Sequence, residues 1–146
     1  MKRLATAIGK GLVAGFAGTA AMTVSSTLEA KLRGRAFSTA PAQAAQRLLG
    51  IESFSSPAAE ARFSNLVHWG YGTSWGVARA VLGLVLPPRA AAVAHFTAVW
   101  GGALVMLPAL DVAPPVWEWG GEEVAIDVFH HTVYVATTAV AYERLR

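Results

Sequence analysis

The sequence contains no cysteine and few charged residues, and both shortages narrow the kind of protein it encodes. Without thiols, disulfide bonds, thiolate metal sites and cysteine nucleophiles are excluded. Charged residues make up only 14% of the 146 residues, whereas they make up about a quarter of a typical soluble domain. Hydrophobic residues make up 54%, and the net charge of +3 is small and scattered. This composition favours a lipid bilayer as the partner and speaks against nucleic acid.

Apolar runs predict four membrane spans within a single domain over residues 1–146. Each run is long enough, at a rise of about 1.5 Å per helical residue, to cover most of the hydrocarbon layer. The expected fold is all-α: an integral membrane four-helix bundle with up-down-up-down order and both termini on one side. The four predicted spans cover about residues 8–28, 63–86, 90–107 and 122–142.

The amphipathic loop 29–62 is the longest polar stretch and contains signals for one short helix. Ser38 and Thr39 are candidate caps, Pro41 stands near the expected start, and Gly50 stands near the expected end. We expect this helix to lie along the membrane interface between spans one and two rather than to cross the bilayer.

The connection between spans two and three consists of Pro87, Pro88 and Arg89. Prolines end a helix, and a connection this short joins antiparallel neighbours. The sequence therefore predicts a tight hairpin in which spans two and three touch along much of their length.

The distribution of basic residues favours a bacterial inner-membrane protein with cytoplasmic termini. In that orientation the third loop, which has four acidic residues and no Lys or Arg, faces outward. The basic residues of the first loop would also face outward and weaken the prediction, and the N-terminal segment could instead be a cleaved signal peptide. The cytoplasmic face would contain Lys2, Arg3, Lys10, Arg89, Arg144 and Arg146.

All four histidines fall inside predicted spans, where ionisable groups are rare and mark pathways, ligand sites or mutual pairs. Steps of three and four residues place the polar residues of the last span on one side of a helix. Their depth predicts a polar cluster near the first and third loops, and a secondary polar pair, Arg79 with His95, near the opposite side. Alternatively, Arg79 extends to the membrane interface at the second loop. The cluster would comprise Glu29, His68, Asp127 and His131, with His130 deeper or flanking and Tyr134 on the same helical face.

Three interpretations fit this cluster. Its hydrogen bonds could hold the helices in register, or its His, Asp and Glu side chains could respond to or conduct protons. Alternatively, His68 and His131 could bind a divalent metal or a haem, although no cofactor is required by the pattern. We favour a non-enzymatic protein that responds to protons, with the haem- or metal-binding protein and the structural or assembly partner as alternatives.

Neither a nucleophile elbow nor an HExxH, P-loop or dinucleotide-binding motif occurs, so no enzymatic activity is expected. Glycines in the apolar helices instead favour close helix packing, within one protomer or in a homo-oligomer. The packing glycines are Gly11, Gly15, Gly18, Gly72 and Gly76.

Several segments resemble the uncharacterised YagU-like family of small bacterial inner-membrane proteins. These segments are "KGLVAGFAGTAAMT" with the following "LRGR", "HWGYGTSWG", and the closing "APPVWEWGGEEVAIDVFHHTVYVATTAVAYE". The resemblance touches every predicted span and implies a four-span inner-membrane protein. The family brings no catalytic residues to carry over.

Overall fold

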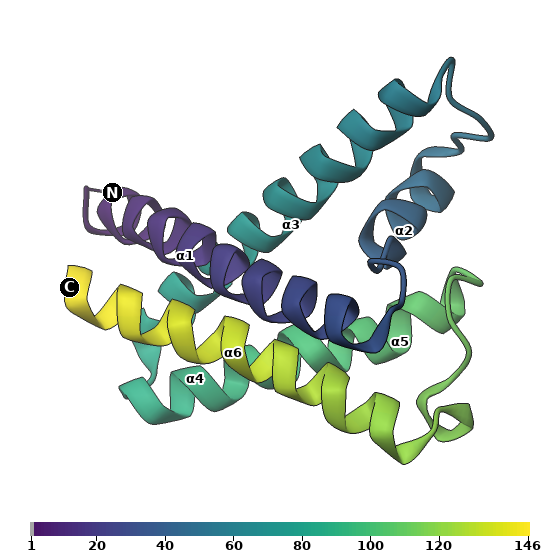
Figure 1. The fold of residues 1–146 in the computed structure, drawn as a ribbon. Helices are drawn as coiled ribbons and strands as arrows, with labels where there is room; N and C mark the ends of the chain where they lie inside the picture. The colour runs from purple at the N-terminus through teal and green to yellow at the C-terminus, as the bar shows by residue number, and fades with distance from the viewer. Residues whose placement is uncertain (1) are drawn as a thin grey trace.

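The computed structural model describes residues 2–146 and is built of helices, which confirms the all-α class (Figure 1). No strand occurs in this part of the chain. The middle of the chain forms one continuous helical unit over residues 88–109, in which a π-helical stretch, η1, joins α4 to α5. The elements are α1 (Lys2–Arg33), α2 (Ala40–Leu49), α3 (Pro57–Val85), α4 (Pro88–Phe96), η1 (Thr97–Gly101), α5 (Gly102–Ala109), the 3₁₀ turn η2 (Val116–Glu118) and α6 (Gly121–Leu145).

Local signals explain where the helices begin and end. Gly50 follows α2 with a φ of 64°, and this left-handed conformation confirms the end predicted for the short helix. Ser56 caps α3, because its side chain accepts a hydrogen bond from the Ala59 amide at 3.2 Å, and Pro57 occupies the first helical position. Pro87 and Pro88 then separate α3 from α4.

Three helices are long and apolar enough to cross a membrane: α1, the unit 88–109, and α6. They correspond to spans one, three and four of the prediction. Span two corresponds to α3, which has 29 residues but does not reach the same hydropathy. The lower hydropathy follows from its polar and small residues, among them Asn65, His68 and Arg79.

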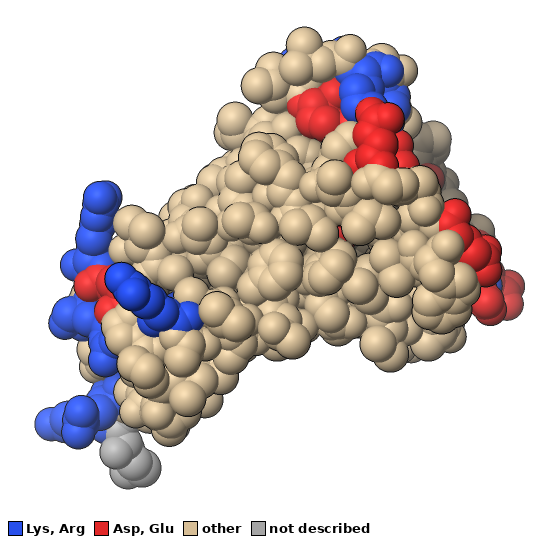
Figure 2. Space-filling model, turned by 90° about the horizontal axis from the view of Figure 1, so that it is seen from below, with Lys and Arg blue, Asp and Glu red and all other residues tan. Residues whose placement is uncertain are grey.

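Charged residues gather at the two ends of the molecule, and the face between them is almost free of charge (Figure 2). The two termini lie at the same end (Figure 1), where the Lys10 ammonium donates to the Arg146 carbonyl at 3.3 Å. Large apolar side chains such as Val13, Leu66 and Val105 point outward and are 60–73% exposed. An uncharged, apolar belt of this kind suits contact with lipid.

Close packing of α1 against α3 and α6 forms the centre of the fold. Gly11 and Gly15 of α1 face Gly76 of α3, and a Cβ added to Gly76 would lie 2.8 Å from Gly15 Cα. A Cβ added to Gly18 would likewise overlap with the Thr138 side chain of α6. With Gly72, which meets Thr19 of α1, all five predicted packing glycines make contacts within one chain. A homo-oligomer, which stays a prediction, would need another surface.

The predicted contact between spans two and three along much of their length is wrong. α3 contacts α4 next to the turn, but it packs chiefly on α1 and does not run along α5. Instead α3 crosses α1 and its N-terminal half diverges from α5, with α2 lying between them (Figure 1). The reason is that the glycines of α3 allow a closer approach to α1 than the side chains of α5 would allow. The divergence leaves room for a cavity.

We expect Gly76→Ala to destabilise the protein by about 1–3 kcal/mol, the usual range for overpacking. The new methyl group would meet the Gly11 carbonyl and the Gly15 backbone, neither of which can rotate away. Unfolding in mixed micelles with increasing SDS, followed by circular dichroism, measures the effect.

Gly70→Ala, in the same helix, is the matched control. A Cβ there has no neighbour within 4 Å, so stability should stay the same or rise by about 0.5–1 kcal/mol through helix propensity. Equal stability losses in the two variants would contradict close α1–α3 packing at Gly76.

Candidate functional site

A cavity of about 950 Å³ lies between α1, α2, α3, α5 and α6. Most of its walls are apolar, but five of the six residues of the predicted polar cluster line it. The sixth, Glu29, reaches the cavity wall through its contact with His130. The five that line the cavity are His68 from α3 and Asp127, His130, His131 and Tyr134 from α6.

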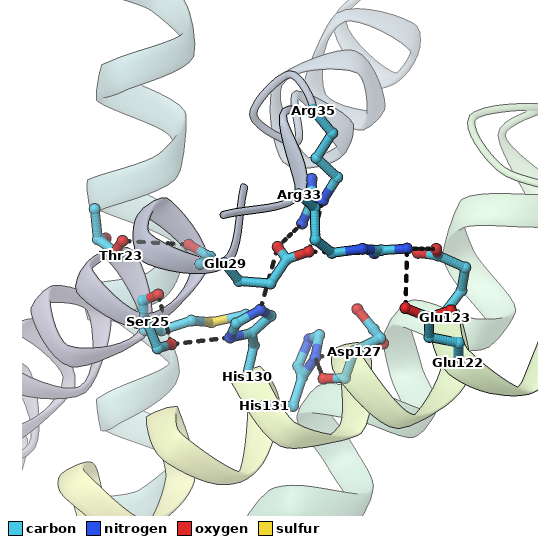
Figure 3. A network of polar contacts seen from close by, with 12 residues as sticks. Thr23, Ser25, Glu29, Arg33, Arg35, Glu122, Glu123, Asp127, His130 and His131 are labelled. Carbon is cyan, nitrogen blue, oxygen red and sulfur yellow. Dashed lines mark hydrogen bonds and ion pairs between the residues drawn. The ribbon is translucent and has the colours of Figure 1, made fainter. Parts of the chain in front are cut away.

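His130 is the most buried histidine of the cluster, with 5% of its surface exposed. Its Nδ1 lies 2.9 Å from Ser25 Oγ, whose own proton is donated to the Met22 carbonyl at 3.0 Å. His130 Nδ1 is therefore the donor to Ser25. The second nitrogen, Nε2, has no hydrogen-bond partner in the described part of the chain and lies 3.6 Å from Glu29 Oε2 (Figure 3).

This arrangement corrects the prediction that His131 lies next to Glu29 with His130 flanking. In the structure His130 lies next to Glu29, and His131 lies beside Asp127. Adjacent residues of a helix point about 100° apart, so only one of them can face α1. The packing of α6 on α1 through Gly18 and Thr138 turns His130, eight residues before Thr138, toward Glu29.

Glu29 belongs to a network of charges at the mouth of the cluster (Figure 3). It accepts hydrogen bonds from Arg33 at 3.2 Å and from Arg35 Nε at 2.9 Å. Arg33 also contacts Glu123 at 2.6 Å and Glu122 at 3.4 Å. Sequence reasoning missed both arginines, although Arg33 stands four residues after Glu29, the spacing of an ion pair on one helix.

Asp127 lies one helical turn before His131 and is held by groups without a permanent charge. The His131 Nδ1 donates to the Asp127 backbone carbonyl at 2.8 Å and lies 3.5 Å from its carboxylate. Trp100 of η1 donates from Nε1 to Asp127 Oδ2 at 2.8 Å, a contact that no sequence pattern indicated. Within residues 2–146, no Lys or Arg forms an ion pair with Asp127.

His68 shares the cavity with these groups but does not contact the carboxylates predicted as its neighbours. Its Nε2 donates instead to Thr23 Oγ1 of α1 at 2.8 Å, because the threonine proton is already donated to the Thr19 carbonyl. The divergence of α3 from α6 accounts for the difference. In the described part of the chain no three His, Asp or Glu side chains are arranged to hold a metal ion.

The predicted pair of Arg79 and His95 is wrong as a direct contact. Both side chains are fully buried, but Arg79 Nη2 pairs with Glu143 at 2.7 Å, and Arg79 Cζ lies 5.0 Å from the centre of the Tyr142 ring. The His95 Nε2 donates to the Trp75 carbonyl at 3.0 Å. Glu143 is the partner that sequence reasoning missed, although it lies in the last turn of α6, at the end of the molecule where α3 also ends.

Comparison with protein-family models, with curated proteins and with solved structures gave no match. The resemblance to the YagU-like family therefore stays a prediction. A proposal about function therefore rests on the residues that line the cavity.

We expect Glu143→Gln to lower the free energy of unfolding by about 3 kcal/mol, because it leaves the buried Arg79 charge without a counter-charge. The double variant Arg79→Met with Glu143→Gln removes both charges and should recover most of that loss. Unfolding in mixed micelles measures both. A double variant as unstable as the single one would show that the pair matters for packing rather than for charge.

Proposed function

We propose that this is a non-enzymatic, four-span protein of a bacterial inner membrane that responds to pH through protonation of His130. The spans would be α1, α3, the helix over residues 88–109, and α6. α3 is included because Arg79 is its one charge between residues 63 and 85, and Arg79 is buried against Glu143. At about 43 Å, its 29 residues exceed the hydrocarbon thickness.

The positive-inside rule supports cytoplasmic termini for this topology. Two of the basic residues near the first loop, Arg33 and Arg35, are engaged by acidic side chains and so argue less against this orientation than free basic residues would. The end that contains both termini carries Lys2, Arg3, Lys10, Arg144 and Arg146. The polar cluster then belongs to the outer half of the membrane.

The observation that carries the proposal is the unpartnered His130 Nε2 opposite the Glu29 carboxylate. A lone pair that faces an anion is unfavourable in a buried site, and a proton added there creates a charge-assisted hydrogen bond. Burial opposes the added charge, while the Glu29 carboxylate 3.6 Å away favours it. Such a balance makes the protonation state sensitive to small changes in its surroundings.

The geometry favours a response to protons on one side over conduction across the membrane. His130 lines the cavity, through which water can supply a proton. Deeper in the molecule Arg79 carries a permanent positive charge, fully buried, which would oppose a proton on any group near it. A continuous path of protonatable groups would have to pass this charge.

The ring nitrogen NMR signals of His130 should show proton uptake as the pH of a nanodisc sample falls from about 7 to 5, the range in which histidines titrate. In the Glu29→Gln variant, protonation of His130 should need a more acidic pH, because the carboxylate that stabilises the protonated ring is gone. His95 is the internal control and should stay neutral, since it has only a backbone carbonyl as its partner. A neutral His130 at pH 4 in folded protein would contradict the proposal.

A haem- or metal-binding protein is the second candidate, because His68 and His131 line one cavity and each has a ring nitrogen without a partner in the chain. An absorption spectrum and elemental analysis of one purified sample separate the two candidates. We expect neither a Soret band nor a stoichiometric metal. A Soret band that disappears in His68→Ala would favour haem.

A further inference from the structure

We infer that the cavity is a binding site for a hydrophobic organic cation and that the Asp127 carboxylate is its counter-charge. The inference rests on the proposed function, since the cavity that exposes His130 is the one that would hold the ligand. It adds a ligand class that the proton response alone does not require.

The balance of charge around the cavity is the first argument. Of the acidic residues that line it, Glu123 is paired with Arg33, whereas Asp127 has no Lys or Arg partner within residues 2–146. The one arginine that lines it, Arg35, is already engaged by Glu29. A third acidic residue, Glu118, is exposed. The unbalanced fixed charge of the cavity is therefore negative, which favours a cationic ligand over an anionic one.

The neighbours of Asp127 hold its carboxylate in place without a permanent counter-charge. Trp100 donates to Oδ2, and His131 donates to the backbone carbonyl rather than to the carboxylate. Oδ1 has no hydrogen-bond partner among residues 2–146. The side chain is 33% exposed although it lies more than one helical turn inside α6. One carboxylate oxygen is thus free to meet a ligand.

The walls suit a cation that is itself hydrophobic. Aromatic rings attract delocalised cations through their faces, and apolar side chains favour the body of such a ligand. A strongly hydrated metal ion would need several oxygen ligands, and no such group occurs in the described residues. The volume of about 950 Å³ lies within the range of about 300–1,000 Å³ that is usual for drug-sized ligands. The aromatic lining residues are Phe37, Tyr71, Trp75, Trp119 and Tyr134.

The buried, unpartnered Nε2 of His130 is an independent observation at the same cavity. A proton there adds a positive charge on the helix that carries Asp127, three residues away. Proton and organic cation should therefore compete, and each should weaken the binding of the other by the same factor.

Tetraphenylphosphonium is a suitable probe, used with the purified full-length protein in detergent at pH 7.5 and isothermal titration calorimetry. We expect saturable binding of one cation per chain, and a loss of affinity of at least about tenfold in Asp127→Asn. Glu123→Gln, a lining residue already paired with Arg33, is the matched control and should retain wild-type affinity. Asp127→Glu keeps the charge and should retain binding if Asp127→Asn does not fold.

Tetraphenylborate, which has the same shape and the opposite charge, provides a test on the wild-type protein alone. It should not displace the phosphonium ion. Displacement by the borate, wild-type affinity in Asp127→Asn, or no saturable binding would each overturn the inference, and a titrating His130 would still support the proposed function. Charge-dependent phosphonium binding that is independent of pH would instead keep the ligand site and remove the proton response.

Discussion

The close contact between α1 and α3 at Gly11, Gly15 and Gly76 is the constraint on which the rest of the structure depends. Lipid tails are as apolar as leucine, so helices in a membrane associate where small residues let their backbones approach. α1 uses Gly11 and Gly15 toward α3 and Gly18 toward α6. It thereby becomes the central helix of the molecule, and the positions of the polar side chains follow from its two contacts.

The cavity is a consequence of the same contact. A helix that crosses α1 at its glycines cannot also run along α5, so the N-terminal half of α3 diverges and α2 covers only part of the opening. His68 moves with α3 to Thr23, while the polar side of α6 stays against the space left behind. Polar groups that a tight bundle would have paired with one another therefore line a cavity with apolar walls.

The charges divide into those that are satisfied and those that are left over. Arg33 and Arg35 share Glu29 and Glu123 at one end, and Arg79 meets Glu143 toward the other. Buried polar groups are costly unless paired, which explains this matching. Several buried nitrogens still have no hydrogen-bond partner among the described residues: Nε and Nη1 of Arg79, Nδ1 of His95 and Nε2 of His130. Of the groups without a full set of partners, His130 and Asp127 line the cavity, where a proton or a ligand can reach them.

The amino-acid sequence by itself determined the helical class, the packing role of the glycines, the short helix closed by Gly50 and the polar side of α6, because all of these follow from local periodicity and residue size. The tertiary structure decided which partners meet. Adjacent His130 and His131 point in different directions, and only the seating of α6 on α1 selects the one that faces Glu29. Arg79 likewise pairs with Glu143, 64 residues away in the sequence, and not with His95. Pairing of this kind depends on crossing angles and helix rotation, which no single helix encodes.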